Sequence, residues 1–498
     1  MCHTPREHQH TEWEDPHGDS TPLLSSTQSK SWRVLLPPIR YVVVILGLLG
    51  CMVDYLVRFG LSVAIVSMVV DTGSPNTSLP LPDGACPAAL NNTQHDSVSG
   101  EGTFDWTVEQ QGIILGIFFW GYFITKMTGG RISEMVGPWQ TMAVSLGVSG
   151  VLSLLCPFAA HLHPMALASV RLLMGLVQGP SFPALYSVLA RWAPPDELAT
   201  MVTIAYSGMS CGSLVAMGTS GWIIEHLGWE WVFYGGGILS LLWTPLWLAF
   251  VRNSPKNHPF VTPQEFSLLS LNIHVKPKRH VPWSRLLRCW RFLPCIMAEF
   301  ASSWVTTLTT TEGPTFLNAQ IGMSLDEVGS VLTVGQTLTW FAAFIYGRTS
   351  DLLTKNGILS KINTRRLMHT IGMVLVVLGL CGLAWAGCDK WMVAVLLIVV
   401  MVGCPSTLCS FTLAPMDIAP NYAGTLSGLL GLGNVSGFLA PVITAQLITH
   451  AGCWTAPLLL CAGLYLAVGL VYITTLTTEV QDWNDYDEIP STHDNLNV

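Results

Sequence analysis

The sequence predicts an all-α polytopic membrane protein with about twelve transmembrane helices. Hydrophobic residues make up 50% of the 498 residues and charged residues only 11%, whereas ordinary soluble domains carry roughly 25% charged residues. Apolar runs of about 20 residues, the length that crosses a bilayer as a helix, recur from one end of the chain to the other. Because unpaired backbone groups are costly in lipid, we expect these runs to be helical.

The apolar runs fall into two sets of six. The expected spans are approximately residues 38–70, 109–129, 139–159, 164–190, 200–225, 230–251, 290–312, 327–346, 367–387, 391–414, 422–448 and 454–475. The first six occupy residues 38–251, the second six occupy residues 290–476, and the polar segment 252–289 connects them. The flanking segments 1–37 and 477–498 are polar tails, and we expect the first to be disordered.

The placement of lysine and arginine predicts the orientation. Nearly all loop lysines and arginines fall on the side of both termini, and the long 71–108 connection contains neither residue type. By the positive-inside rule, both termini are therefore cytosolic and the 71–108 loop faces the lumen or the extracellular space. That loop carries two N-glycosylation sequons, at Asn76 and Asn91.

Both tails contain short patterns of the kind that sorting adaptors bind. Asp19, Leu23 and Leu24 fit the acidic dileucine pattern, and Tyr486 with Ile489 fits the tyrosine-based pattern. In cytosolic tails these patterns predict binding to clathrin adaptors. They favour a lysosomal, endosomal or vesicular membrane, with the plasma membrane as the alternative.

Two arginines lie deep within the predicted spans. Arg58 is in the first span and Arg171 in the fourth. A charge in the bilayer core is costly, so it is retained where it faces an aqueous path or an opposite charge. Two fixed cations predict a site for an anion. Asp54, one turn before Arg58, keeps a second interpretation open, in which the arginines only brace helices; we weight anion contact more heavily for Arg58 than for Arg171.

Related glycine and charge motifs follow the second and eighth spans. The first motif is GGRISEMVG, with Gly130, Arg131 and Glu134, and the second is GRTSD, with Arg348 and Asp351. Both resemble the Gly-x-x-x-Asp/Arg-Gly signature of the major facilitator superfamily, although Glu134 stands where aspartate is common. The resemblance implies two six-helix bundles with a substrate site at their interface, and a cytosolic gate closed by the motif charges.

Longer stretches resemble the anion:cation symporter branch of that superfamily, which contains sialin, the vesicular glutamate and nucleotide transporters and the sodium–phosphate cotransporters. The matching stretches include RFGLSVAIVSMV, QGIILGIFFWGYFITKMTGG, VRLLMGLVQGPSFPALYSVLARWAPP, GWEWVFYGGG, NTRRLM and APMDIAPNYAGTLSG. The resemblance covers roughly residues 38–484, and the final stretch EVQDWN is most similar to sialin.

The branch resemblance implies roles for several residues. Arg58 and Arg171 occupy the positions associated with the anionic substrate. Tyr122 lies in an aromatic segment of the second span and is our candidate for a hydrogen bond to the substrate, whereas Lys126 is expected at the gate. Asp417 belongs to the APMDIAPNYAG stretch, where it caps or latches a helix.

The chain departs from the branch at residues linked to proton coupling. Gln178 stands where sialin and the glutamate transporters have a glutamate, and Tyr186 stands near the position of a sialin histidine. Glu299 in the seventh span is therefore a coupling candidate, as is Asp54, because a carboxylate in a low-dielectric interior suits reversible protonation. Pairing of Glu299 with the loop cation Arg291 is the alternative. The span-seven arginine of the glutamate transporters aligns with Ser302, which makes glutamate a poorer substrate.

These observations predict a secondary active transporter of organic anions that works by alternating access and is driven by a proton gradient or the membrane potential. The partners would be a small organic or inorganic anion, a co-transported proton or sodium ion, and the lipid bilayer. An acidic sugar or other carboxylate, exported as by sialin, is the first choice, and a nucleotide, phosphate or urate-type anion is the second. A non-transporting receptor or sensor on the same scaffold is a further alternative.

Other classes of function receive no support from the sequence. It contains no nucleophile–base pair, phosphate-binding loop or nucleic-acid surface, so we expect no enzyme, no cofactor and no nucleic-acid partner. The thirteen cysteines lack metal-binding spacing. Cys86, Cys388 and Cys453 lie near the non-cytosolic side, where a disulfide among them is an open prospect.

Overall fold

The computed structural model describes residues 37–69, 103–270, 283–287, 289–451 and 453–485. The predicted glycosylation sites Asn76 and Asn91 lie outside this part of the chain. So do the predicted sorting residues Asp19, Leu23, Leu24, Tyr486 and Ile489.

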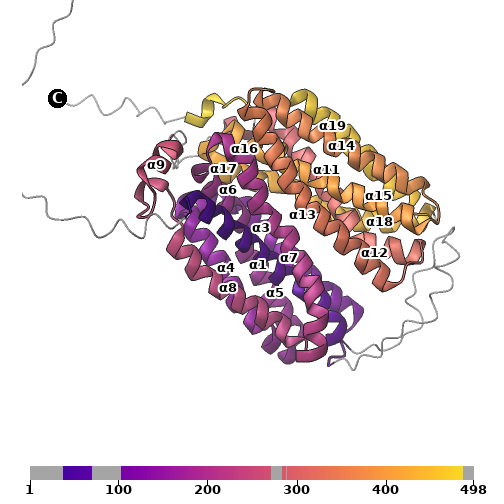
Figure 1. Cartoon of the computed structure of the whole chain (residues 1–498). Helices are drawn as coiled ribbons and strands as arrows, with labels where there is room; N and C mark the ends of the chain where they lie inside the picture. The colour runs from indigo at the N-terminus through magenta and orange to yellow at the C-terminus, as the bar shows by residue number, and fades with distance from the viewer. Residues whose placement is uncertain (1–36, 70–102, 271–282, 288, 452, 486–498) are drawn as a thin grey trace, which may run out of the picture. The chain divides into compact units, whose positions relative to one another are not determined.

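Nearly all of the described residues of the first half are helical, and the membrane-length apolar runs form the expected spans (Figure 1). They are α1 (Ile39–Met68), α3 (Val108–Val136), α4 (Pro138–Leu162), α5 (Pro164–Gln178), α6 (Ser181–Trp192), η2 (Pro195–Glu197), α7 (Leu198–Leu227) and α8 (Glu230–Phe250). An isolated bridge between Val69 and Phe104 joins the end of α1 to the segment before α3. The connection between the halves contains η3 (Pro255–Asn257), α9 (Pro263–Ser270) and α10 (Trp283–Leu287).

The second half contains more interrupted helices than the first. Its elements are η4 (Trp290–Phe292), α11 (Leu293–Thr307), η5 (Leu308–Glu312), α12 (Gly313–Thr315), η6 (Phe316–Gln320), α13 (Leu325–Lys355), α14 (Lys361–Trp385), α15 (Lys390–Gly403), η7 (Cys404–Cys409), η8 (Phe411–Leu413), α16 (Ala414–Ile418), η9 (Pro420–Tyr422), α17 (Ala423–Leu430), η10 (Gly431–Val435), α18 (Ser436–Ala451), α19 (Thr455–Thr475) and η11 (Asp482–Asp485). The π-helical segments η5 and η6 widen the seventh span locally.

Local sequence explains where the helices begin and end. Thr107 caps the start of α3 through a reciprocal pair of hydrogen bonds with Gln110, at 3.2 and 3.0 Å. Gly137, at φ +113°, ends α3 in a backbone conformation that residues with a side chain rarely adopt, and α4 starts at the next residue. Gly228, at φ +98°, makes the same kind of turn between α7 and α8.

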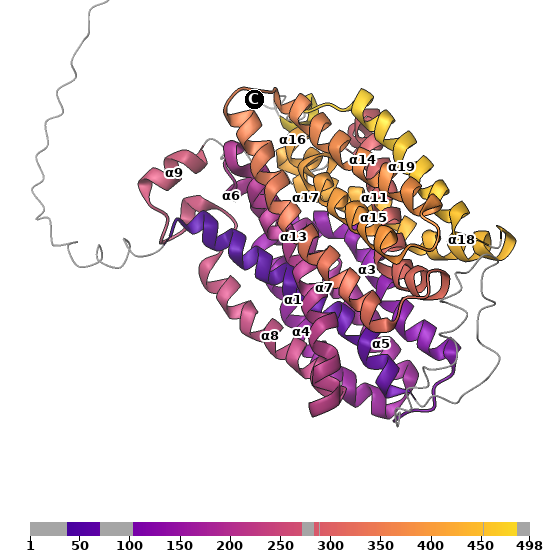
Figure 2. The same ribbon diagram turned by 45° about the vertical axis from the view of Figure 1, so that its right-hand side comes forward.

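The two halves form two bundles, each with a hydrophobic core. The core of the first bundle also includes a few residues of the second half: Met368, Cys409, Leu413, Met416 and Ala423. Figures 1 and 2 show the first-half helices, indigo to magenta, grouped together, and the second-half helices, orange to yellow, grouped beside them. The most extensive packing between the bundles is that of α7 on α13 and of α3 on α17, and α6 also packs on α17. Glycines allow the close approach: a side chain at Gly130 on α3 would overlap the backbone carbonyl of Gly424 on α17.

Eleven helical segments of the described chain are long and apolar enough to cross a membrane. The predicted seventh span is the composite helix that runs from Leu293 to Gln320, so the predicted spans all correspond to helices. Several boundaries differ from the prediction. The fourth span breaks between Gln178 and Ser181, and both charge motifs lie on the last turns of helices, α3 and α13, rather than in the loops that follow.

Candidate functional site

Arg58 is buried on the inward face of α1, with 6% of its surface exposed. Its Nη2 donates to the Asp54 carboxylate at 2.9 Å, one helical turn away. Four aromatic rings surround the guanidinium: the centres of the Tyr122, Tyr55, Phe118 and Phe182 rings lie 4.3, 4.7, 5.2 and 6.0 Å from Cζ. The face of an aromatic ring attracts a guanidinium, and this cation–π attraction is stronger where water is excluded. The predicted residues Arg58, Asp54 and Tyr122 therefore lie together.

Arg171, on α5, reaches the same place from a second helix. Its Nη2 donates to the backbone carbonyl of Arg58 at 3.1 Å, and its Cζ lies 4.8 Å from the centre of the Phe118 ring. Only 2% of Arg171 is exposed, and its Nε and Nη1 have no hydrogen-bond partner among the described residues. No carboxylate of the described chain lies within ion-pair distance of this guanidinium. Arg171 is thus a buried cation without a paired acid.

The charges around Arg58 do not cancel. Two guanidinium groups and one carboxylate give the cluster a net positive charge in the interior of the first bundle. A buried cation and buried N–H groups without partners are both costly. A bound anion would offset both costs, because it would balance the positive charge and accept hydrogen bonds from the free N–H groups. The cluster therefore has the properties of an anion-binding site.

The two residues at which the chain departs from the branch pattern, Gln178 and Tyr186, are both buried. Gln178 is 1% exposed and donates to Ser149 Oγ at 2.6 Å. The Tyr186 hydroxyl donates across the bundle interface to the Thr412 carbonyl at 2.8 Å. Gln178 therefore joins helices within the first bundle, and Tyr186 joins α6 to η8 of the second. Neither side chain carries a carboxylate or an imidazole.

Glu299 lies on α11, facing the first bundle. The positive charge that acts on its carboxylate is that of Lys126 on α3, and its polar neighbour is Asn434 on η10. Arg291, the alternative partner, is not among the charges that act on it. Ser302 follows one turn later on α11 and is half-buried.

The motif acids bind helix N-termini in the opposite bundle. Glu134, at the end of α3, accepts hydrogen bonds from the backbone N–H and the hydroxyl of Thr425 on α17, at 2.8 and 2.6 Å. Asp351, near the end of α13, accepts from the backbone N–H groups of Ala199 and Thr200 on α7, at 3.1 and 2.6 Å. A carboxylate satisfies the free N–H groups at a helix start and interacts favourably with the helix dipole. These reciprocal contacts join the bundles at the end predicted to be cytosolic.

The other motif charges divide into partnered and exposed groups. Arg131 lies 3.6 Å from Glu134, whereas Arg348 is exposed. Asp417 is buried and binds Arg365 at 3.0 Å and Lys361 at 2.7 Å, both on α14. The sequence pattern predicts no role for these two cations beyond a place among the loop charges on the predicted cytosolic side. The stretch NTRRLM, which contains Arg365, was the signal that could have identified a structural role.

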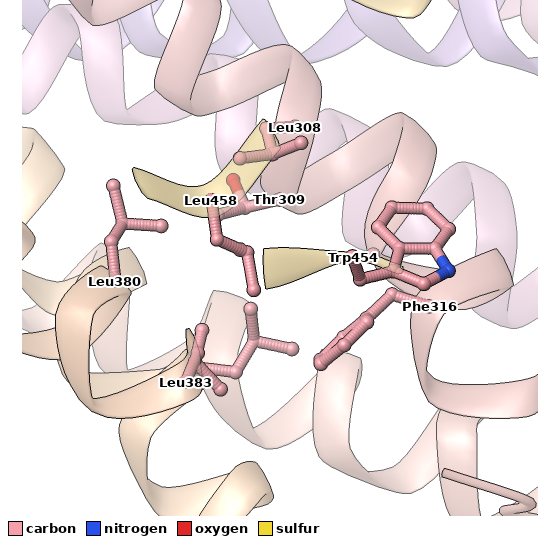
Figure 3. Close-up of a pocket in the computed structure, with 9 residues that line it drawn as sticks. Leu308, Thr309, Phe316, Leu380, Leu383, Trp454 and Leu458 are labelled. Carbon is pink, nitrogen blue, oxygen red and sulfur yellow. The ribbon is translucent and has the colours of Figure 1, made fainter. Parts of the chain in front are cut away.

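A small cavity inside the second bundle is a poor anion site. Figure 3 shows that it is lined by apolar side chains, including Trp454, Phe316 and Leu380, with Thr309 as the polar exception. It lies beside the π-helical segment η5. Such a lining offers neither a cation nor a cluster of donors for a charged ligand.

The cysteines give a mixed outcome for the predicted disulfide. Cys388 is disulfide-bonded, whereas Cys453 is free. Cys86 lies outside the described residues. Within the described chain, no cluster of histidine, cysteine and acidic residues could hold a metal ion.

The sequence profile of the Major Facilitator Superfamily matches residues 47–441 of the chain. The chain belongs to the major facilitator superfamily. Human sialin is 30% identical over 482 residues, which cover 94% of this chain and 96% of sialin. Vesicular glutamate transporter 3 of Danio rerio is 28% identical, over 90% of this chain and 75% of that protein.

Solved structures of the superfamily share the fold. The proton:xylose symporter XylE, bound to 6-bromo-6-deoxy-D-glucose, superimposes with a TM-score of 0.66 at 14% identity, over 88% of this chain and 97% of XylE. The fucose:proton symporter FucP of E. coli superimposes with a TM-score of 0.59. The predicted fold class of two six-helix bundles and the predicted family are confirmed.

Proposed function

We propose that this protein is a secondary active transporter that carries an organic anion across a membrane by alternating access. The observation that carries the proposal is the buried positive cluster, in which Arg58 and Arg171 face a single carboxylate, Asp54. In the first bundle of a two-bundle carrier, such a cluster can neutralise the carboxylate or phosphate of a substrate. Tyr122, whose ring packs on Arg58, would donate its hydroxyl to the same substrate.

The motif acids would act as the gate on the cytosolic side. The Glu134–Thr425 and Asp351–Thr200 contacts cross between the bundles, so rocking of the bundles must break them. Substrate binding would then supply the free energy that separates these contacts, because a ligand shifts a conformational equilibrium only by binding one state more tightly. Arg131 would hold Glu134 in position, and Asp417 would fix α14 to α16.

The preferred substrate is an acidic sugar or another carboxylate. Support comes from the identity to sialin over nearly the full length of both chains and from the positive cluster. The relatives also include vesicular glutamate transporters, but Ser302 offers no third cation for a dicarboxylic amino acid. A nucleotide, phosphate or urate-type anion is the runner-up. A co-transported proton or sodium ion, or the membrane potential, would drive the cycle, with Glu299 and Asp54 as coupling candidates.

A lysosomal, endosomal or vesicular membrane is the proposed location, with both termini in the cytosol. The names of the relatives, sialin and vesicular glutamate transporters, accord with this location, as do the tail sorting patterns. The plasma membrane is the alternative, and surface labelling of a tagged chain in cells distinguishes the two.

Uptake into proteoliposomes tests the function directly. The purified full-length chain is reconstituted and offered a panel of labelled anions, comprising an acidic sugar, glutamate, a nucleotide, phosphate and urate, with and without an imposed pH gradient. We expect accumulation of the acidic sugar above protein-free liposomes. Absence of uptake for every anion under every gradient would contradict the proposal.

A non-transporting sensor is the second candidate, because Gln178 and Tyr186 provide no titratable acid or imidazole at the positions of the branch. Counterflow separates the two functions. A transporter exchanges labelled external anion for unlabelled internal anion, whereas a sensor binds the anion without any flux.

A further inference from the structure

Two opposite charges, one from each bundle, have side chains that pack on the short segment η10. A Cβ atom built on Gly431 would lie 2.9 Å from Cε of Lys126, and one built on Gly433 would lie 2.7 Å from Cβ of Glu299. Both side chains therefore pack directly on the glycines of η10, two residues apart. Any larger residue at Gly431 or Gly433 would displace one of the two charges.

Lys126 also lies next to the positive cluster. Its Nζ is 5.5 Å from the centre of the Tyr122 ring, and Arg58 Cζ is 4.3 Å from the same ring centre. Lys126 and Tyr122 are one helical turn apart on α3. The Tyr122 ring therefore contacts two cations. Lys126 lies one helical turn closer than Tyr122 to Glu134, the gate residue at the end of α3.

The Lys126 ammonium group acts electrostatically on Glu299 but forms no direct ion pair with it. No ion pair within 4.0 Å joins Lys126 to a carboxylate of the described chain. The charge that acts on Glu299 is that of Lys126 from α3, with Asn434 as a polar neighbour. Glu299 in turn acts electrostatically on the hydroxyls of Tyr122, Tyr186, Tyr206 and Tyr465, from α3, α6, α7 and α19. Lys126 is the single full charge in this set.

We propose that Lys126 is a second anion-binding cation on the path from Arg58 to the cytosolic gate, and that Glu299 controls its availability. An ionised Glu299 neutralises the ammonium group, whereas a protonated Glu299 leaves its charge free for the incoming anion. The proton enters from the more acidic compartment onto a carboxylate oxygen of Glu299 and leaves from that oxygen on the other side. This inference rests on the proposed function and names how that function is coupled to protons.

The competing explanation is a structural one, in which Lys126 and Glu299 merely brace α3 against α11 and η10. Bracing predicts loss of stability or of maximal rate in both variants, with no effect on how KM depends on pH. Control of the anion site predicts that both variants lose the pH dependence of KM, with KM high in Lys126→Gln and low in Glu299→Gln. The pH profile of KM therefore separates the two explanations.

The experiment uses the full-length chain in proteoliposomes and the labelled anion of the panel that the wild type takes up best. Initial rates give KM at an acidic pH of about 5.5 and at a nearly neutral pH of about 7.5. We expect a lower KM at the acid pH for the wild type. Lys126→Gln should raise KM at the acid pH roughly tenfold, because one charge-assisted contact to the anion is lost. KM of this variant should no longer depend on pH.

Glu299→Gln should have the opposite effect, because the amide mimics a protonated acid. We expect the low KM at both pH values, retained exchange and no accumulation driven by a pH gradient. Lys126→Arg, which keeps the charge, should retain the wild-type pH profile. Lys355→Gln, at an exposed cation at the end of α13, is the matched control and should behave as the wild type.

A pH dependence of KM in Glu299→Gln equal to that of the wild type would overturn the inference. This test does not depend on whether Lys126→Gln folds, since each variant is measured independently. Unchanged KM in a well-folded Lys126→Gln would overturn it as well. Both results would leave the proposed function standing, because the wild type would still transport the anion. Failure of the wild type to take up any anion would instead reject the proposed function.

Discussion

Arg171 donates a hydrogen bond to the backbone carbonyl of Arg58 at 3.1 Å, which ties the two buried cations to each other across α5 and α1. A carbonyl within a helix normally accepts from the N–H four residues later, so this bond uses its second lone pair. The contact keeps two positive side chains side by side although they repel. The repulsion is tolerable if an anion or Asp54 shares the site.

Replacement of Arg171 should reveal whether this contact positions Arg58. We expect Arg171→Lys to raise KM for the transported anion several-fold, since lysine keeps the charge but lacks the planar fork that reaches the Arg58 carbonyl. Arg171→Met, which removes the charge, should raise KM further. Initial uptake rates in proteoliposomes provide KM. A KM that is equal for the wild type and both variants would assign Arg171 to helix packing alone.

Removal of the Asp54 carboxylate should increase the positive charge of the cluster. We expect Asp54→Asn to lower KM for the anion and to reduce the free energy of unfolding by about 3 kcal/mol, because one partner of a buried ion pair is lost. Thermal unfolding in detergent monitors the second effect. If KM rose instead, Asp54 would be needed to orient Arg58 rather than to balance its charge. Loss of gradient-driven accumulation with exchange retained would identify Asp54 as a proton carrier.

The reciprocal caps at the bundle interface predict two similar gate variants. Glu134→Gln and Asp351→Asn should each weaken the closed cytosolic gate by about 1–2 kcal/mol, because a neutral amide interacts less favourably with a helix N-terminus than a carboxylate does. Cysteines introduced at the gate and labelled from the cytosolic side measure its opening. We expect faster labelling in both variants, and labelling at the wild-type rate would argue against a gate.

Gly130 tests the close packing of α3 on α17. Gly130→Ala places a methyl group against the Gly424 carbonyl, whereas Gly112→Ala, on the same helix, meets nothing within 4 Å. We expect the first substitution to open the gate or to lower the melting temperature, and the second to leave both unchanged. Equal behaviour of the two variants would contradict the interface.

Much of the fold could be predicted because bilayer thickness fixes the length of each apolar run. The site could be predicted in part: intramembrane charge singled out Arg58, Arg171 and Glu299 without any structure. The hydrogen bond from Arg171 to Arg58, and the position of Lys126 opposite Glu299, depend on how helices rotate and pack. Periodicity does not determine that rotation when a helix is apolar on most sides.

The motif acids show the same limit at the bundle interface. The motifs predict that Glu134 and Asp351 lie at the ends of two related spans. They do not predict which helices these acids cap, since the capped ends lie 291 and 151 residues away in the chain. The interruptions in α11–η6 also escaped prediction, since π-helical turns carry no strong sequence signal.

The proposed transport requires that the cluster around Arg58 bind the negative charge of the substrate. Uptake of an acidic sugar and of its neutral methyl ester by the wild type and by Arg58→Gln tests it most directly, with Lys355→Gln as the control. We expect the wild type and the control to take up the acid and not the ester, and Arg58→Gln to lose uptake of the acid by at least roughly tenfold. Uptake of the acid by a well-folded Arg58→Gln at the wild-type rate would contradict the claim.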